Sequence, residues 1–248
     1  MTMYNYQIKI EYDGTFFVGW QIQKNGRSIQ EKIEKVFSKI LKSKINLIGA
    51  GRTDKGVHAI GQYANFKINK PVKDIRKFLG SVNYFLNKHL ISIIKITKKK
   101  LDFNSRFNAK ERIYEYVIIN RESNLSLDKN RAWHIKKKLD LTLLKKGAKI
   151  LEGKHNFSTY RAASCSSRSP IKKINFIKIK RKGTRIIIVF SSKSFLQNQV
   201  RSMVGCLMYL SCHKWNLEEF KKSFKSKKRA MCAPPAPAKG LYLYNVRY

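Results

Sequence analysis

The first regular element of the chain begins with Tyr4-Asn5-Tyr6-Gln7-Ile8-Lys9-Ile10-Glu11-Tyr12, and the predicted architecture is built outward from this pattern. Its larger apolar side chains recur at every second residue, which is typical of a half-buried strand, and Asp13-Gly14 predicts a turn at its end. Ser28-Ile29-Gln30-Glu31 then has the spacing of a capping box, and apolar residues follow at helical period as far as Leu41. A strand and a helix of about four turns are therefore predicted.

Two more strands, a helix and a last strand complete the first half. Ile45–Ile48 is a short apolar run, residues 49–56 are rich in glycine and predict a loop, and Gln62–Ile68 predicts the next strand. Pro71 predicts the start of a helix, and the β-branched run Ile91–Thr97 predicts a strand. The first half therefore has the order βαββαβ.

The second half shows the same order with one added helix. Its predicted elements are a strand over 112–120, a helix over 140–151 capped by Asp140, a hairpin of strands 171–180 and 185–191 around Gly183-Thr184, helices over 199–212 and 216–225, and a strand over 241–248. The order of elements, without any repeat of individual residues, predicts an α+β protein of two similar domains, residues 1–104 and 105–248.

The charge of the chain indicates a polyanionic partner. Lys and Arg number 53 against 15 acidic residues, which gives a formal net charge of +38, far more than solubility requires. An anionic membrane would also fit this charge, but no segment has the pattern of a Lys-rich amphipathic helix, so nucleic acid is preferred. Part of the excess can be compositional drift, because Lys also fills surface-like stretches such as 136–138. Charge alone therefore identifies no binding face.

The apolar segments and the cysteines predict a soluble, cytoplasmic protein without a metal. No apolar run approaches the roughly 20 residues that a membrane-spanning helix needs, so no membrane partner is expected. The four cysteines at 165, 206, 212 and 232 form no Cys-x-x-Cys pair, which argues against both a zinc site and a disulfide framework.

The predicted loop between the second and third strands concentrates reactive side chains. Gly51-Arg52-Thr53-Asp54-Lys55-Gly56-Val57-His58-Ala59 contains a carboxylate, two cations and an imidazole. Loops on a rigid scaffold often carry function, although Asp and Gly are also common in ordinary tight turns. Composition alone favours the ordinary turn, and His58 has no metal-binding set around it and is expected to be structural.

These nine residues closely resemble the signature of the TruA family of pseudouridine synthases, whose aspartate is essential. Matching segments extend the resemblance over nearly the whole chain, in order: Glu11–Thr15, Gly19–Gln21, Ser28–Glu31, Arg106–Ala109, Arg112–Tyr116, Phe157-Ser158, Arg168–Pro170, Phe195–Leu196, Gln199–Arg201, Met203–Gly205 and Ala236–Leu243. The chain departs from the family at two positions. Lys55 stands where the family often has Ala, and Asn87 stands where the family usually has Pro, a change that can loosen a turn.

The resemblance implies the site residues. Asp54 would be the catalytic carboxylate, acting as a nucleophile at C1′ of the ribose or as a base that lets a glycal form, and both routes stay open. Arg201 would keep that carboxylate ionised, unless it is a solvated helix-start residue. Tyr114 would line the uracil pocket, unless it is an ordinary strand aromatic of the core. Arg52 would grip phosphate or help displace the target base, and no cofactor is required.

The resemblance also implies a fold and a substrate. It implies two ferredoxin-like domains with sheets joined around a basic central cleft, a homodimer, and conversion of uridine at positions 38, 39 and 40 in the anticodon stem-loop of tRNA. Flipping the base out of the stem would be repaid in part by an aromatic face. Two alternatives stay open, a non-catalytic RNA-binding or chaperone protein on the same fold and a pseudouridine synthase with another RNA target.

Overall fold

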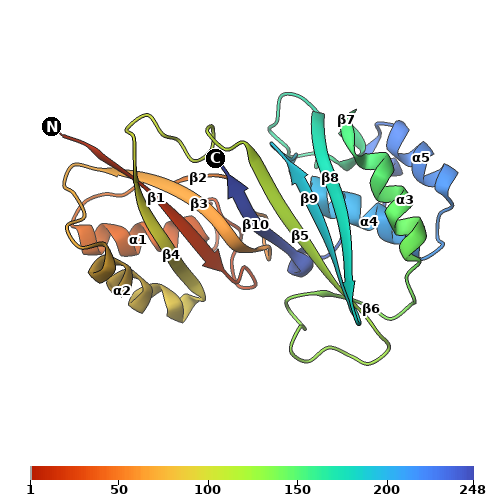
Figure 1. Ribbon diagram of the computed structural model, residues 1–248, viewed down its shortest axis with the longest axis horizontal. Helices are drawn as coiled ribbons and strands as arrows, with labels where there is room; N and C mark the ends of the chain where they lie inside the picture. The colour runs from red at the N-terminus through yellow and green to blue at the C-terminus, as the bar shows by residue number, and fades with distance from the viewer. Residues whose placement is uncertain (1) are drawn as a thin grey trace. The chain divides into compact units, whose positions relative to one another are not determined.

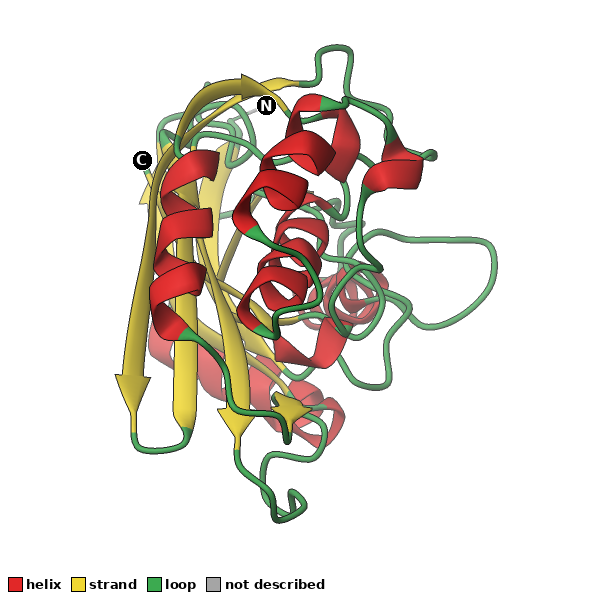
Figure 2. Cartoon of the chain, turned by 90° about the vertical axis from the view of Figure 1, so that its right-hand side faces the viewer, coloured by secondary structure: helices red, strands yellow, loops and turns green. Residues whose placement is uncertain are grey.

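The computed structural model describes residues 2–248, and the contacts within the chain divide it into two compact units. The first unit contains residues up to Lys110 together with Leu243–Tyr248, and the second contains Glu111–Tyr242. Both units combine a sheet with helices that cover one of its faces (Figures 1 and 2), so the predicted α+β class is confirmed.

The first unit follows the predicted order βαββαβ. Its elements are β1 (Tyr4–Tyr12), α1 (Ile29–Leu41), β2 (Ile48–Gly49), β3 (His58–Ile68), α2 (Ile75–Leu86) and β4 (Ile91–Lys99). The sheet has the order β4-β1-β3-β10, where β10 (Leu241–Arg247) comes from the end of the chain, and β2 pairs with β3. β1 is therefore a central strand and is antiparallel to both β3 and β4.

The core of the first unit lies between α1, α2 and the sheet. Ser28 caps α1 by accepting the Glu31 backbone N–H at 3.2 Å, which starts the helix at Ile29 as the capping box predicts. The Phe37 ring of α1 then packs edge-on against Phe66 of β3 at 5.4 Å and Phe78 of α2 at 5.2 Å. Burial of these large rings stabilises the three elements against one another.

Two predicted boundaries in this unit were wrong. The strand over 45–48 is reduced to Ile48–Gly49, because β3 begins at His58 and only its later residues face β2. The second helix begins at Ile75 and not at Pro71, because the carboxylate of Asp74 accepts the Lys77 N–H at 2.9 Å and acts as its N-cap.

The second unit contains the strands and helices predicted for the second half except the last strand, β10, most of which belongs to the first unit, and it has two short strands that were missed. Its elements are β5 (Glu111–Asn120), β6 (Trp133–Ile135), α3 (Leu141–Leu151), β7 (Gly153–Asn156), β8 (Ile171–Lys182), β9 (Arg185–Ser192), α4 (Gln199–Ser211) and α5 (Leu217–Lys225). The strands have the order β5-β9-β8-β7, and β6 adds to β5 in parallel. The unpredicted strands β6 and β7 are too short to show a period in the sequence.

Helix packing in the second unit depends on close approach. Gly147 of α3 faces Leu207 and Leu210 of α4, where an added Cβ would lie 2.9 and 2.7 Å from their side chains. Asp140 caps α3 as predicted, with its carboxylate accepting the Thr142 and Leu143 N–H groups at 2.8 and 2.9 Å.

The four cysteines all lie in the second unit. Cys165, Cys206 and Cys212 are buried, Cys232 is partly exposed, and all four are free thiols. Within residues 2–248, no group of three or more His, Cys, Asp or Glu side chains is arranged to hold a metal ion. Across the same residues, no helix is long and apolar enough to span a membrane.

Candidate active site

The loop that carries Asp54 is tied to the sheet at its start. The Ala50 N–H donates to the Tyr63 carbonyl at 2.7 Å, and the amide of Gln62 donates to the Gly51 carbonyl at 2.7 Å. Gln62 itself is fully buried in β3. Two hydrogen bonds to a central region of the sheet therefore fix where the loop leaves it.

Thr53 anchors the middle of the loop inside the unit. Its hydroxyl is buried and lies 2.7 Å from the Tyr12 hydroxyl at the end of β1. Its carbonyl accepts the Trp20 N–H at 3.0 Å. Gly19, with a φ of +118°, allows this contact, because a Cβ at that position would lie 2.6 Å from the Thr53 carbonyl oxygen. Thr53 is thus held by two segments of the first unit, the end of β1 and residues 19–20.

A tight turn follows Asp54. The Val57 N–H donates to the Asp54 carbonyl at 3.1 Å. Gly56 has a backbone φ of +75°, which residues other than glycine rarely adopt. His58 then starts β3, fully buried, and its Nδ1 accepts the Gly14 N–H at 3.1 Å. The backbone of Asp54 is therefore constrained on both sides.

The two predicted site residues of this loop differ in exposure. Asp54 is half-buried between the anchored Thr53 and the turn, whereas the Arg52 side chain is exposed. Within residues 2–248, no hydrogen bond or ion pair engages the Arg52 guanidinium. A half-buried carboxylate on a constrained backbone beside an exposed cation suits contact with a charged substrate.

Tyr114 and Tyr116 of the second unit lie on the same face of β5. Tyr114 pairs with Phe190 of β9, is 8% exposed, and meets the Phe195 ring edge-on at a centroid distance of 5.2 Å. Tyr116 is fully buried, and its hydroxyl donates to the Pro237 carbonyl at 2.7 Å. Burial raises the pKa of Tyr116 well above its usual value, and the nearby charge of Arg201 offsets only part of that rise.

Arg201 stands in the first turn of α4 and is held in one orientation. Its Nε donates to the Ala236 carbonyl at 2.7 Å, and its Nη1 donates to Asn198 Oδ1 at 3.3 Å. The Arg201 backbone carbonyl in turn accepts the Ala236 N–H at 2.9 Å. The guanidinium is therefore not a freely solvated one.

The segment 234–237 has a role that was missed in the sequence. The carbonyls of Ala236 and Pro237 accept hydrogen bonds from Arg201, a predicted site residue, and from Tyr116, which ends a segment that matches the family. The match of Ala236–Leu243 to the family was the available signal. Arg52 and Asp54 lie in the first unit, and Tyr114 and Arg201 lie in the second.

The family model of tRNA pseudouridine synthases matches residues 8–108 and 148–248, together most of the chain. The chain therefore belongs to the tRNA pseudouridine synthase family and is an isomerase.

Among curated proteins, the chain is similar to tRNA pseudouridine synthase A of Pelagibacter ubique, with 55% identity over 99% of this chain and 100% of that protein. The proteins of the same name from Maricaulis maris and Parvibaculum lavamentivorans are 39% and 40% identical to it over 99% of this chain. The matches include 98% and 100% of those two proteins.

Proposed function

We propose that the protein converts uridine to pseudouridine at positions 38, 39 and 40 of the tRNA anticodon stem-loop, with Asp54 as the catalytic carboxylate. The observation that carries the proposal is the placement of Asp54, half-buried and directly after the anchored Thr53 in the family signature. A carboxylate that must meet one ribose carbon benefits from a backbone that cannot drift.

The proposed reaction rearranges bonds without oxidation or reduction. The N1–C1′ bond breaks, the uracil turns within the pocket, and a C5–C1′ bond forms, after which C5 has lost a proton and N1 has gained one. Asp54 acts in its ionised form, either attacking C1′ or accepting a ribose proton so that a glycal forms. No cofactor enters this balance.

The other three residues are proposed to serve binding and charge. Arg201, fixed by the Ala236 carbonyl, favours an ionised carboxylate in the closed site. Tyr114, nearly buried beside Phe195, lines the uracil pocket and offers an aromatic surface to the flipped base. Arg52, exposed on the loop, contacts phosphate or fills the space that the flipped base leaves.

The proposal extends to the assembly. We further propose that the protein is a cytoplasmic homodimer in which the first unit carries the catalytic loop and the second unit contributes Tyr114 and Arg201. The formal charge of +38 supports an electrostatic grip on the tRNA backbone, since phosphate contacts supply most of the affinity of such complexes.

The test compares the wild type with Asp54→Asn on unmodified tRNA transcripts that carry U38, U39 or U40. Pseudouridine is mapped by carbodiimide treatment and primer extension. Asp74→Asn is the matched control, because Asn caps a helix as well as Asp and Asp74 lies at the start of α2. We expect product at these positions from the wild type and the control, and at least a roughly 10³-fold lower rate from Asp54→Asn, as for loss of a residue central to catalysis.

The outcomes separate the alternatives. Binding of tRNA without conversion by the wild type would favour a non-catalytic RNA-binding protein. Pseudouridine at other nucleotides would support the proposed reaction but identify another RNA target site. Full activity of Asp54→Asn would remove Asp54 from its proposed role.

A further inference from the structure

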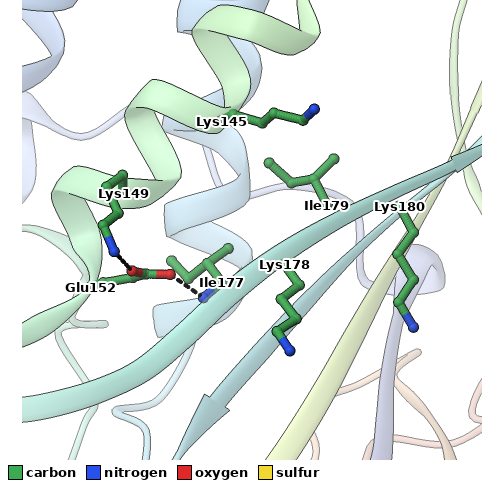
Figure 3. Close-up of a pocket in the computed structure, with 7 residues that line it drawn as sticks. All are labelled: Lys145, Lys149, Glu152, Ile177, Lys178, Ile179 and Lys180. Atoms are coloured by element: carbon green, nitrogen blue, oxygen red, sulfur yellow. Dashed lines mark hydrogen bonds and ion pairs between the residues drawn. The ribbon is translucent and has the colours of Figure 1, made fainter.

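A cavity of about 340 Å³ opens in the second unit between α3 and β8 (Figure 3). Four lysines line it together with one carboxylate, Glu152, and the isoleucines of β8. Lys145 and Lys149 stand one turn apart on α3, and Lys178 and Lys180 stand two residues apart on β8. We call these four lysines the lysine edge.

The lysine edge carries an uncompensated positive charge. Four lysines and one glutamate leave a net charge of +3 around the cavity. Glu152 pairs with Lys149 at 2.7 Å and also accepts the Ile177 N–H at 2.9 Å. Burial alone would raise the pKa of Glu152, but these hydrogen bonds more than offset it, so the pKa lies below the usual value. Glu152 therefore stays ionised, yet it neutralises only one of the four cations.

The remaining three lysines make no ion pair in the described chain, residues 2–248. The Lys178 ammonium lies 4.9 Å from the centre of the Phe176 ring. Burial raises the pKa of the half-buried Glu115, and the nearby charge of Lys180 offsets only part of that rise. Neither contact cancels the charge at the cavity. Lys145, Lys178 and Lys180 are thus available to an anion.

The backbone beside the cavity is an open strand edge. β7 pairs with β8 through Ile171–Ile174, and among the described residues, 2–248, no strand neighbours the later residues of β8 on that side. The Ile177 N–H points to this edge, where Glu152 accepts it. Lys178 and Lys180 extend from the side of β8 that faces away from α3 and its two lysines, as Figure 3 shows. The open edge is therefore flanked by cations on both sides.

We propose that the lysine edge binds the sugar–phosphate backbone of the tRNA substrate, outside the pocket for the target base. The identity of the RNA rests on the proposed function. The two lysine pairs repeat at about 6 to 7 Å along helix and strand, a regular spacing that suits successive phosphates.

The register of the sheet places this surface near Tyr114. Tyr114 of β5 pairs with Phe190 of β9, which pairs with Ile177 of β8. Ile177 lines the cavity and is therefore two strand spacings, about 10 Å, from Tyr114. An RNA strand whose base reaches Tyr114 can place neighbouring phosphates along the lysine edge.

Lysines on an exposed edge strand can also serve only to prevent aggregation by strand pairing. The experiment therefore measures RNA binding directly. It compares the wild type with a triple variant, Lys145→Gln, Lys178→Gln and Lys180→Gln. The matched control is Lys222→Gln, Lys225→Gln and Lys228→Gln, which removes the same charge from exposed lysines at and after α5.

The dissociation constant for unmodified tRNA is measured by fluorescence anisotropy over a series of salt concentrations. We expect the lysine-edge variant to bind tRNA roughly 10- to 100-fold more weakly at physiological salt. The slope of log binding constant against log salt concentration should be shallower by about 2 to 3, and the control should change little in both. Arginine at the same three positions should restore binding, which separates loss of charge from loss of folding. Light scattering records the state of association.

Unchanged tRNA affinity and salt dependence in the lysine-edge variant would overturn the proposal. Aggregation of that variant in light scattering would then favour edge protection as the role of these lysines. An equal loss in the control would overturn it too, because the effect would then be general charge. The proposed function fails separately. A wild type that forms no pseudouridine while its binding depends on the lysine edge would refute the proposed function and leave the RNA site in place.

Discussion

At the scale of single residues, Thr53 determines how its neighbours are presented. The Thr53 side chain is buried against Tyr12, and its carbonyl is held by Trp20. The side chains on either side of it therefore lie nearer the surface, with Arg52 exposed and Asp54 half-buried. One short threonine thus fixes the direction of the two residues that the proposed reaction needs.

Tyr116 gives a prediction at the same scale. Its folded-state pKa lies above the unfolded value of about 10 because burial disfavours the charged phenolate. The stability that the neutral phenol contributes is thus fully present below pH 10 and is lost as pH rises above it. We expect Tyr116→Phe to be less stable than wild type by about 1 to 3 kcal/mol at pH 8. That gap should narrow by up to about 1.4 kcal/mol per pH unit above pH 10.

Urea unfolding at several pH values between 8 and 11 measures this gap. Tyr84→Phe is the control, because Tyr84 is 79% exposed. A gap between wild type and Tyr116→Phe that stays constant up to pH 11 would show that the folded state does not hold the Tyr116 proton more tightly than the unfolded chain.

At the scale of elements, the contact between α4 and the segment 234–237 connects packing to the site. A Cβ at Gly205 of α4 would lie 2.1 Å from the Pro234 carbonyl oxygen, so only glycine allows the segment to lie this close. The same segment presents the carbonyls that bind Arg201 and Tyr116. Displacing it would therefore move both partners.

Gly205→Ala is expected to lower the free energy of unfolding by about 1 to 3 kcal/mol through overpacking. The same change should slow pseudouridine formation, because the carbonyls that hold Arg201 would shift. Gly80→Ala is the matched control in α2, where an added Cβ meets nothing within 4 Å. That control should gain about 0.5 to 1 kcal/mol from helix propensity. Equal effects of the two variants on thermal unfolding would contradict the close contact at Gly205.

The sequence predicted most elements because their signals are local. The alternation of residues 4–12 and the caps at Ser28 and Asp140 each describe one element without reference to the rest of the chain, and the structure confirms them. The start of α2 was wrong because Asp74 competes with Pro71 for the same role. Local signals compete where two residue types both favour a helix start.

Across the whole molecule, the partners of the site residues could not be predicted in the same way. Tyr114 and Tyr116 stand two residues apart in a predicted strand, a spacing that alone puts both on one face, and the register of β5 agrees with it. Their contacts with Phe195 and Pro237 arise from segments far along the chain. No pattern of period 2 or 3.6 contains such distant pairings, so only the family resemblance indicated that these segments matter.

The return of β10 to the first unit is another contact of this distant kind. The Lys110 N–H donates to the Arg247 carbonyl at 2.8 Å, the Tyr248 hydroxyl donates to the Ser105 carbonyl at 3.0 Å, and Leu243 is fully buried. Gly61 of β3 lies so close to β10 that an added Cβ would be 2.4 Å from the Tyr244 carbonyl oxygen. β10 thus completes the sheet and core of a unit whose other elements end at Lys110.

Removal of residues 243–248 should therefore destabilise the first unit more than the second. Loss of Leu243 alone is expected to cost about 2 to 5 kcal/mol, since it empties a buried site. Hydrogen exchange should show the amides of β3 losing protection, while those of β8 and β9 keep most of theirs. Tyr244→Ala is the control, because Tyr244 lies on the same strand and is 41% exposed. Equal loss of protection in β3 and β9 would instead mean that the two units unfold as a single cooperative structure.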